Sequence, residues 1–355
     1  MSDYNALQRM LHYVALANTS ILEATLDAEL AFCKSRLKDQ SLPKHVFVSG
    51  LARGGTTILM RSLYESRQFS SLTYADMPFV LAPNIWFKIS AKSRKQMAAK
   101  ERAHGDGILV DFNSPEALDE VFWRTFSRKQ YVHKKYLLPH DCNDEIIDKY
   151  RKYIAAVLIR YATDRYLSKN NNNILRFGSI FRALPNAMIL VPFRDPVQHA
   201  NSLLTQHALF NKKQSEDRFV RRYMSWLGHY EFGLSHKPFK VGENQDTYSD
   251  TEKIEYWLQQ WRNVYRFLLK ENDAYPENTL PISYELLCSE TETLWRALCK
   301  ILDIDNSQPP AMKEKIRETP PVVDNELLAE VQDIYEELTR RCGKALMSEN
   351  RSTEV

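Results

Sequence analysis

The sequence predicts an α/β fold of three layers, in which a central, mostly parallel sheet is flanked by helices. Short apolar segments with the length of strands alternate along the chain with longer segments whose apolar residues have helical spacing. This alternation is typical of parallel sheets. One short segment, residues 187–193, is apolar almost throughout, as expected for a strand that is covered on both faces.

The chain begins with a predicted pair of helices. Apolar residues recur at helical spacing through residues 4–38, and Asn18, Thr19 and Ser20 interrupt the pattern with side chains that favour helix caps. We therefore expect residues 1–40 to form a helical extension that packs on the core.

The α/β domain itself is expected to span residues 41–305. Its predicted strands are residues 45–49, 107–113, 173–177, 187–193 and 279–284. Its predicted helices are residues 55–66, 145–168, 196–210, 215–233, 251–271 and 290–302. The segments expected to be irregular are residues 86–106, 236–252 and 304–323, and the four asparagines at 170–173 are expected to form a turn before a strand.

Residues 306–355 are expected to lie outside the sheet. Prolines at 309, 310, 320 and 321 argue against regular structure and predict a linker. A C-terminal helix at about 324–345 follows the linker, and the last residues form a polar tail.

Composition excludes several classes of protein. With 48 basic and 45 acidic side chains the net charge is only +3, which argues against a nucleic-acid-binding protein. Five scattered cysteines are expected to be free thiols in a reducing compartment. The first residues lack the pattern of a signal peptide, and no apolar run is long enough to span a membrane. These features predict a cytoplasmic protein, whereas its oligomeric state cannot be read from the sequence.

A glycine-rich loop follows the first predicted strand of the sheet. Gly50, Gly55 and Thr57 have the spacing of the nucleotide-binding P-loop, G-x-x-x-x-G-K-S/T, but Thr56 stands where that motif has lysine. Because the lysine contacts the β- and γ-phosphates of a triphosphate, its loss favours a smaller anion bound without metal. Arg53 supplies a positive charge within the loop. The sequence thus predicts a P-loop-like fold.

A second candidate anion site follows the strand at 187–193. Asp195 and Pro196 are a favourable N-cap and first residue for the next helix, so Arg194 is expected at the tip of the strand. Ser202 lies in the second turn of that helix. If this strand is parallel to the first one, both sites lie at the same edge of the sheet, where a guanidinium beside a helix N-terminus suits a phosphate.

These elements together resemble the PAPS-dependent sulfotransferases, which use 3′-phosphoadenosine 5′-phosphosulfate (PAPS) as sulfuryl donor. The loop Arg53-Gly-Gly-Thr-Thr57 resembles their 5′-phosphosulfate loop, and the spacing from Arg194 to Ser202 resembles their 3′-phosphate element. The segment that begins at Tyr284 resembles their late Tyr-Glu-x-Leu element. The resemblance covers about residues 44–305. A segment of the form G-x-x-G-x-x-K, typical of cytosolic small-molecule sulfotransferases, is absent, so the chain looks closer to the bacterial carbohydrate-type or tyrosylprotein-type branches.

The resemblance implies an enzyme that transfers a sulfuryl group from PAPS to a hydroxyl acceptor, expected to be a carbohydrate, without a metal ion. It implies donor-binding roles for Arg53, Gly54, Gly55, Thr56, Thr57, Arg194, Ser202 and Tyr284. Arg53 is in addition expected to stabilise charge on the leaving phosphate. Aromatic residues that could form a sugar platform are Trp86, Phe87, Trp123, Tyr131 and Trp226, although most of them are expected in the core.

The general base is the least defined part of the predicted site. Asp76 is the first candidate, because related sulfotransferases place a carboxylate base shortly after the helix that follows the glycine loop. A simple turn residue before Pro78 is the alternative interpretation of Asp76. Other candidates for the base are His104, Asp111, Glu116 and His133.

Two other functions remain open at this point. A nucleotide-dependent kinase would have lysine in the loop and an acidic magnesium ligand at a later strand end, where this chain has Thr56 and Arg194. A non-catalytic, nucleotide-binding scaffold of the same fold would keep the binding residues without a working base.

Overall fold

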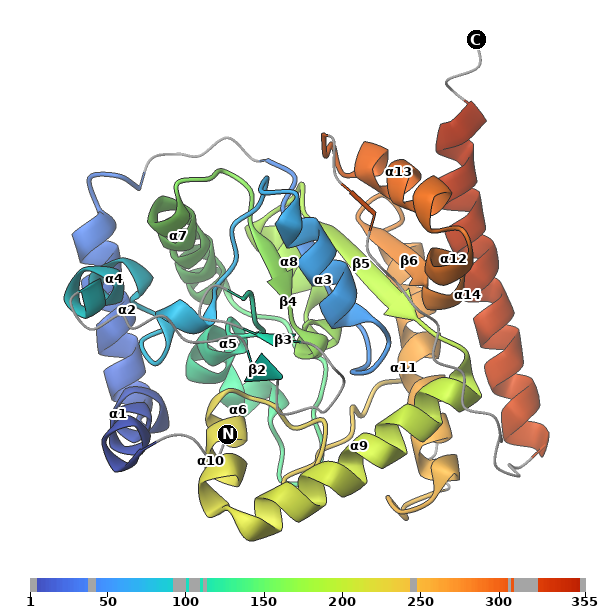
Figure 1. Cartoon of the computed structure of the whole chain (residues 1–355), viewed down its shortest axis with the longest axis horizontal. Coiled ribbons are helices and arrows are strands. Elements are labelled where there is room, and N and C mark those ends of the chain that lie inside the picture. Colours follow the sequence, from blue (N-terminus) through green and yellow to red (C-terminus); the bar gives the residue numbers. More distant parts are fainter. Residues whose placement is uncertain are drawn as a thin grey trace.

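A four-stranded parallel sheet forms the centre of the computed structural model, which describes residues 5–37, 43–91, 100–101, 109–110, 114–242, 248–305, 308–309 and 325–351. The strand order is β4-β1-β5-β6, and each strand is parallel to its neighbours. The strands are β1 (Val46–Val48), β4 (Leu167–Lys169), β5 (Met188–Phe193) and β6 (Thr279–Ser283). Helices flank this sheet (Figure 1), so the predicted α/β fold is confirmed.

The N-terminal helical pair is present as predicted. It consists of α1 (Ala6–Ala17) and α2 (Thr19–Cys33), and Asn18 between them accepts a hydrogen bond from the Ser20 N–H at 2.9 Å. The pair packs at the side of the molecule that also holds α4 (Pro83–Ser90) and α7 (Asp144–Tyr161), as Figure 1 shows.

The remaining helices surround the sheet and connect its strands. They are α3 (Thr56–Glu65), α5 (Glu120–Phe126), α6 (Arg128–Tyr131), α8 (Phe177–Ala183), α9 (Pro196–Glu216), α10 (Arg218–Trp226), α11 (Ile254–Ala274), α12 (Tyr284–Ser289), α13 (Thr291–Ile301) and α14 (Asn325–Arg351). The long C-terminal helix α14 packs against β6 and α11 (Figure 1). No helix in the described ranges has the length and apolar character needed to cross a membrane.

The prediction of a strand at residues 173–177 is wrong. Residues Asn171–Leu175 form a 3₁₀ helix, η3, and the strand next to β1 is β4, which lies where the end of a long helix was predicted. Helix α7 ends at Tyr161, because Ala162 takes the left-handed conformation with φ 55°. The four asparagines at 170–173 follow strand β4, whereas the sequence predicted that they precede a strand. The Asn170 side chain stabilises the turn, because it accepts a hydrogen bond from the Asn172 N–H at 3.0 Å.

Other boundaries also differ from the prediction. Within 107–113, β3 (Leu109–Val110) pairs antiparallel with β2 (Lys100–Glu101) in a separate small sheet, and the rest of that range lies outside the described residues. The segment 86–106, predicted to be irregular, begins inside α4. The helix predicted at 215–233 ends at Trp226, because Gly228 leaves the helical conformation with φ 74°.

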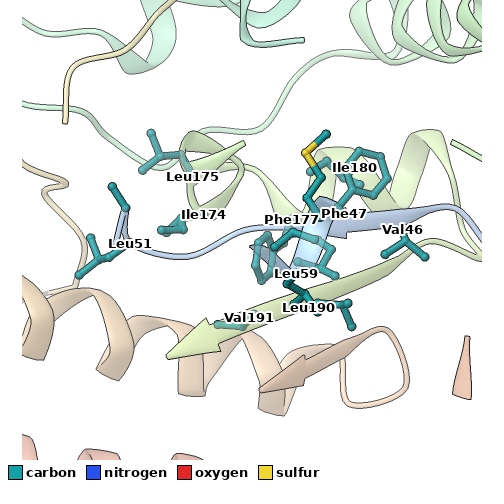
Figure 2. Close-up of a cluster of buried hydrophobic side chains, with 14 of the residues drawn as sticks. Val46, Phe47, Leu51, Leu59, Ile174, Leu175, Phe177, Ile180, Leu190 and Val191 are labelled. Atoms are coloured by element: carbon teal, nitrogen blue, oxygen red, sulfur yellow. The ribbon is translucent and has the colours of Figure 1, made fainter. Parts of the chain in front are cut away.

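The apolar core fixes the strands that carry the site. Val46, Phe47 and Leu190 are fully buried in the middle of the sheet. They pack among side chains from α3, η3 and α8, including Leu59, Ile174, Leu175, Phe177 and Ile180 (Figure 2). Covering of both faces explains why these short strands are apolar throughout.

A buried ion pair lies behind the end of β4. Arg176 contacts both carboxylate oxygens of Glu120, at 2.7 and 3.1 Å, and the two side chains are no more than 1% exposed. Asn170 Nδ2 donates to Glu120 Oε2 at 2.8 Å, and the Tyr131 hydroxyl donates to Oε1. The pair therefore connects α5, α6 and the asparagine turn, and the two hydrogen bonds to Glu120 from Asn170 and Tyr131 compensate in part for its burial.

We predict that breaking this pair strongly destabilises the fold. Arg176→Ala or Glu120→Ala should each lower the free energy of unfolding by about 3–5 kcal/mol, because one charge is left buried without its partner. The double variant Glu120→Leu/Arg176→Met should lose less than the sum of the single losses. Urea denaturation measures all three, and losses below about 1 kcal/mol for the single variants would contradict the role given to the pair.

Candidate active site

The predicted phosphate elements meet at one edge of the sheet. In a parallel sheet the carboxyl ends of all strands lie at the same edge, which is where ligands bind in α/β folds. Here that edge carries the glycine loop after β1, Arg194 after β5 and Tyr284 after β6. The expectation that residues 187–193 run parallel to the first strand is confirmed.

The glycine loop has an unusual backbone at two of its residues. Gly55 is the N-cap of α3 with φ 92°, and Arg53 is also left-handed with φ 71°. A Cβ added to Gly55 would lie 2.8 Å from Cδ2 of Tyr284. Glycine is therefore required both by the backbone conformation and by the close approach of the tyrosine ring.

The first turn of α3 is the part of the loop best suited to bind an anion. Thr56 is buried as the first residue of the helix, and Thr57 follows it. The leading N–H groups of a helix point along its axis, where the positive end of the macrodipole favours negative charge. Gly54 differs from the expectation, since its N–H donates to Leu51 O at 3.3 Å within the loop.

A side-chain contact joins the two predicted phosphate elements. Arg53 Nε donates to Ser202 Oγ at 3.2 Å, although the loop and α9 are far apart in the sequence. A second residue of α9, His199, reaches the same loop and donates from Nε2 to Ala52 O at 2.8 Å. Burial lowers the pKa of His199 to about 3, so its ring is neutral and serves as a structural support of the loop.

Arg194 lies at the tip of β5 over the ring of Tyr284. The guanidinium carbon is 5.2 Å from the ring centroid, and Nε lies 4.0 Å from Glu285 Oε1. The same carboxylate oxygen accepts a hydrogen bond from the Asp195 N–H at 2.9 Å. Asp195 also caps α9 as predicted, because its side chain accepts from the Gln198 N–H at 2.8 Å. Arg194, Tyr284 and the start of α9 thus form one rigid group.

Asp76 is buried in a polar network of its own. It ends the 3₁₀ helix η1 (Tyr74–Asp76) and is 1% exposed. Its Oδ2 accepts hydrogen bonds from the Thr73 N–H at 2.9 Å and from the Tyr161 hydroxyl at 2.5 Å. These contacts give Asp76 a part in the local structure, and its role as general base stays a prediction.

The alternative bases have different surroundings. Glu116 accepts from the Tyr74 hydroxyl at 2.9 Å and from the Ala117 N–H at 2.9 Å. The His133 ring stacks on Tyr136, with ring centroids 5.0 Å apart. His104 and Asp111 lie outside the described residues.

The structure adds polar residues that the sequence did not single out. Lys169 is the last residue of β4 and is paired in register with Val48, directly before the glycine loop. His229 and Glu231 follow α10, and Asn171 connects them to the end of β4 through a hydrogen bond to Glu231. The sequence analysis predicted a helix at these residues and therefore missed Lys169. A prediction of a strand that ends at Lys169 would have placed this lysine at the edge of the sheet that holds the site.

Comparison with known proteins agrees with this arrangement. The profile of the Sulfotransferase family matches residues 43–239, more than half of the chain, and the chain therefore belongs to this family. No curated protein matches it.

Some solved structures are similar at low sequence identity. One is a sulfotransferase from Mycobacterium tuberculosis, with 11% identity and a TM-score of 0.46 over 92% of this chain and 83% of that chain. Another, from Mycobacterium avium, has 12% identity and a TM-score of 0.46 over 94% and 83%. A third, from Alicyclobacillus acidocaldarius, has 13% identity and a TM-score of 0.42 over 86% and 97%. These likenesses are distant, and the family assignment rests on the profile.

We predict that Gly55→Ala disrupts the loop. A left-handed alanine costs roughly 1–2 kcal/mol, and its methyl group must displace the Tyr284 ring. Thermal unfolding should show a lower Tm, and calorimetry should show weaker binding of adenosine 3′,5′-bisphosphate. Gly343→Ala is the matched control, because a Cβ there meets nothing within 4 Å. A Gly55→Ala protein as stable as the control would contradict the strain assigned to this position.

Proposed function

We propose that this chain is a PAPS-dependent sulfotransferase that transfers a sulfuryl group to a hydroxyl acceptor. Family membership indicates a transferase, and the donor is inferred from the site. The observation that carries the proposal is the contact between Arg53 and Ser202 at 3.2 Å. It brings the loop that suits a 5′-phosphosulfate within reach of the residues that suit a 3′-phosphate, and PAPS carries both groups.

The reaction is an in-line displacement at sulfur, for which the protein supplies position and charge. In this proposal the N-terminus of α3, with Thr56 and Thr57, holds the 5′-phosphosulfate, and Arg53 stabilises the charge that develops on the leaving phosphate. Arg194 and Ser202 hold the 3′-phosphate, and Tyr284 contacts the donor. Burial raises the pKa of Tyr284 to about 12, so its hydroxyl stays protonated and can donate a hydrogen bond.

The acceptor is proposed to be a carbohydrate hydroxyl, as the resemblance implies. Trp123 and Tyr131 are fully buried, so they cannot form a sugar platform. This proposal keeps Phe87, which is 39% exposed, and the partly buried Trp86 and Trp226 as candidates, with the Arg160 guanidinium carbon 3.6 Å from the centroid of the Phe87 ring.

Two observations favour this donor over a nucleoside triphosphate. The residue at the P-loop lysine position is Thr56, and the end of β5 carries Arg194 rather than an acidic magnesium ligand. These observations do not distinguish an enzyme from a non-catalytic scaffold of the same fold. A measurement of turnover makes that distinction.

We predict magnesium-independent binding of the donor. Isothermal calorimetry should detect adenosine 3′,5′-bisphosphate and PAPS with equal affinity in EDTA and in magnesium, because the loop lacks the lysine that accompanies a metal-bound triphosphate. Incubation with ³⁵S-labelled PAPS and a panel of saccharides, tyrosine peptides, alcohols and phenols should then yield a labelled product. Tighter, magnesium-dependent binding of ATP would reassign the chain as a kinase, and donor binding without turnover of any acceptor would favour the scaffold.

We predict that Arg194→Ala selectively weakens nucleotides with a 3′-phosphate. Loss of a charge-assisted contact is worth about 1.5–3 kcal/mol, or roughly 10- to 150-fold in affinity. Adenosine 3′,5′-bisphosphate should lose this amount, whereas adenosine 5′-monophosphate should bind almost unchanged. Arg182→Ala, at an arginine on α8 that is paired with Asp144 near the surface, is the control. Equal losses for both nucleotides would reject the assignment of Arg194.

A further inference from the structure

A histidine and a glutamate that the sequence analysis did not single out lie next to the turn that follows β4. His229 follows the last turn of α10, where its backbone N–H donates to Met224 O at 2.9 Å. Its Nδ1 lies 3.6 Å from Glu231 Oε1, an ion-pair rather than a hydrogen-bond distance. The side chains are 20% and 12% exposed, so the pair is shielded but reaches solvent.

Hydrogen bonds hold this pair at the carboxyl edge of the sheet. The Asn170 N–H donates to Val48 O at 3.1 Å, which places the asparagine turn against the end of β1. The next residue, Asn171, donates from Nδ2 to Glu231 Oε1 at 2.9 Å. Because β1 ends at Val48 and the glycine loop begins two residues later at Gly50, the histidine–glutamate pair and the proposed donor site share this edge.

Gly228 fixes the same segment from the other side. It has φ 74°, and a Cβ added there would lie 2.4 Å from Cγ of Glu120. Its carbonyl accepts a hydrogen bond from Asn172 Nδ2 at 2.9 Å. The position of His229 is therefore set by the buried Glu120 and by the asparagine turn.

The charges around the pair favour the protonated form of His229. Burial lowers the pKa of His229, but Glu231 outweighs this effect and raises the pKa above 6.5. Burial raises the pKa of Glu231, but His229 and Lys169 outweigh this and hold it at about 2. Lys169 from β4 also lowers the pKa of the histidine, and Glu116 raises it. A carboxylate next to a histidine stabilises the imidazolium that forms when the ring accepts a proton, which suits general-base catalysis.

We propose that His229 is the general base of the transfer and that Glu231 is its positioning residue. This rests on the proposed function. The acceptor oxygen forms a bond to sulfur while the bond from sulfur to the bridging oxygen breaks, and its electron pair leaves with the 5′-phosphate of the donor. The hydroxyl proton passes to Nε2 of His229, because Nδ1 faces Glu231. The Glu231 carboxylate stabilises the imidazolium that results.

The surroundings of Asp76 make it the weaker candidate. Its Oδ2 already accepts two hydrogen bonds, from the Thr73 N–H and the Tyr161 hydroxyl, so this oxygen is engaged in the local structure. At 1% exposure it also lacks the access to solvent that His229 has.

Turnover and donor binding test the proposal together. With ³⁵S-labelled PAPS and the best acceptor of the panel, His229→Asn should lose about 10²- to 10⁴-fold in kcat, while calorimetry shows unchanged affinity for adenosine 3′,5′-bisphosphate. In the wild-type protein kcat/KM should fall as the pH drops through the pKa of His229, because the base must be neutral. Glu231→Gln should move this acidic limb to lower pH, since the carboxylate no longer raises the pKa of the histidine. Glu145→Gln, at an exposed glutamate of α7, is the control.

Histidine side-chain NMR gives a readout that needs no acceptor. The signal assigned through His229→Asn should titrate at a higher pH than an ordinary histidine. Its titration midpoint should fall in Glu231→Gln and rise when adenosine 3′,5′-bisphosphate adds negative charge nearby.

Two results would overturn the proposal. One is a titration midpoint of His229 that does not change when the nucleotide binds, and the other is a His229→Asn protein that turns over at the wild-type rate. Loss of activity in Asp76→Asn with intact nucleotide binding would then assign the base to Asp76. If the wild-type protein binds neither PAPS nor its product, the proposed function itself fails, and the proposal for His229 fails with it.

Discussion

The buried pair between Glu120 and Arg176 is the interaction on which the rest of the site depends. Two opposite charges removed from water are stable only when they have good partners, and here Asn170 and Tyr131 both donate hydrogen bonds to the Glu120 carboxylate that Arg176 contacts. Because Asn170 is the residue after β4, the pair fixes the end of that strand. Because Gly228 packs on Glu120, the pair also fixes the segment that holds His229.

The two halves of the site are held by different forces. On the donor side, short-range backbone effects dominate: a left-handed Gly55, the start of α3, and the cap of α9 at Asp195. On the side of β4, buried polar contacts between distant segments dominate, as between Asn171 and Glu231. The proposed donor side is thus shaped by local conformation and connected to α9 by the contacts of Arg53 and His199, whereas the other side depends mainly on contacts between distant segments.

Charge is distributed unevenly across this edge. Arg53 and Arg194 follow the ends of β1 and β5, where an anionic donor is proposed, and the Glu231 carboxylate lies next to the turn after β4. Lys169 stands between the two regions, in register with the last residue of β1. An anionic donor and a proton-accepting group can therefore occupy neighbouring places without direct repulsion.

The amino-acid sequence by itself determined the class of fold, the glycine loop, and the position of Arg194 at the end of β5 before the cap of α9. These features depend on glycines, a proline and an apolar strand within a few residues of one another, so their local pattern is enough to predict them. The sequence alone misplaced β4 and with it Lys169, because helical spacing continues past Tyr161 and a three-residue strand leaves little pattern of its own. The burial of Asp76 and the contact between His229 and Glu231 at the edge of the sheet depend on the tertiary structure and could not be predicted from the sequence. Both follow from packing between segments far apart in the chain, and no short stretch of sequence records that packing.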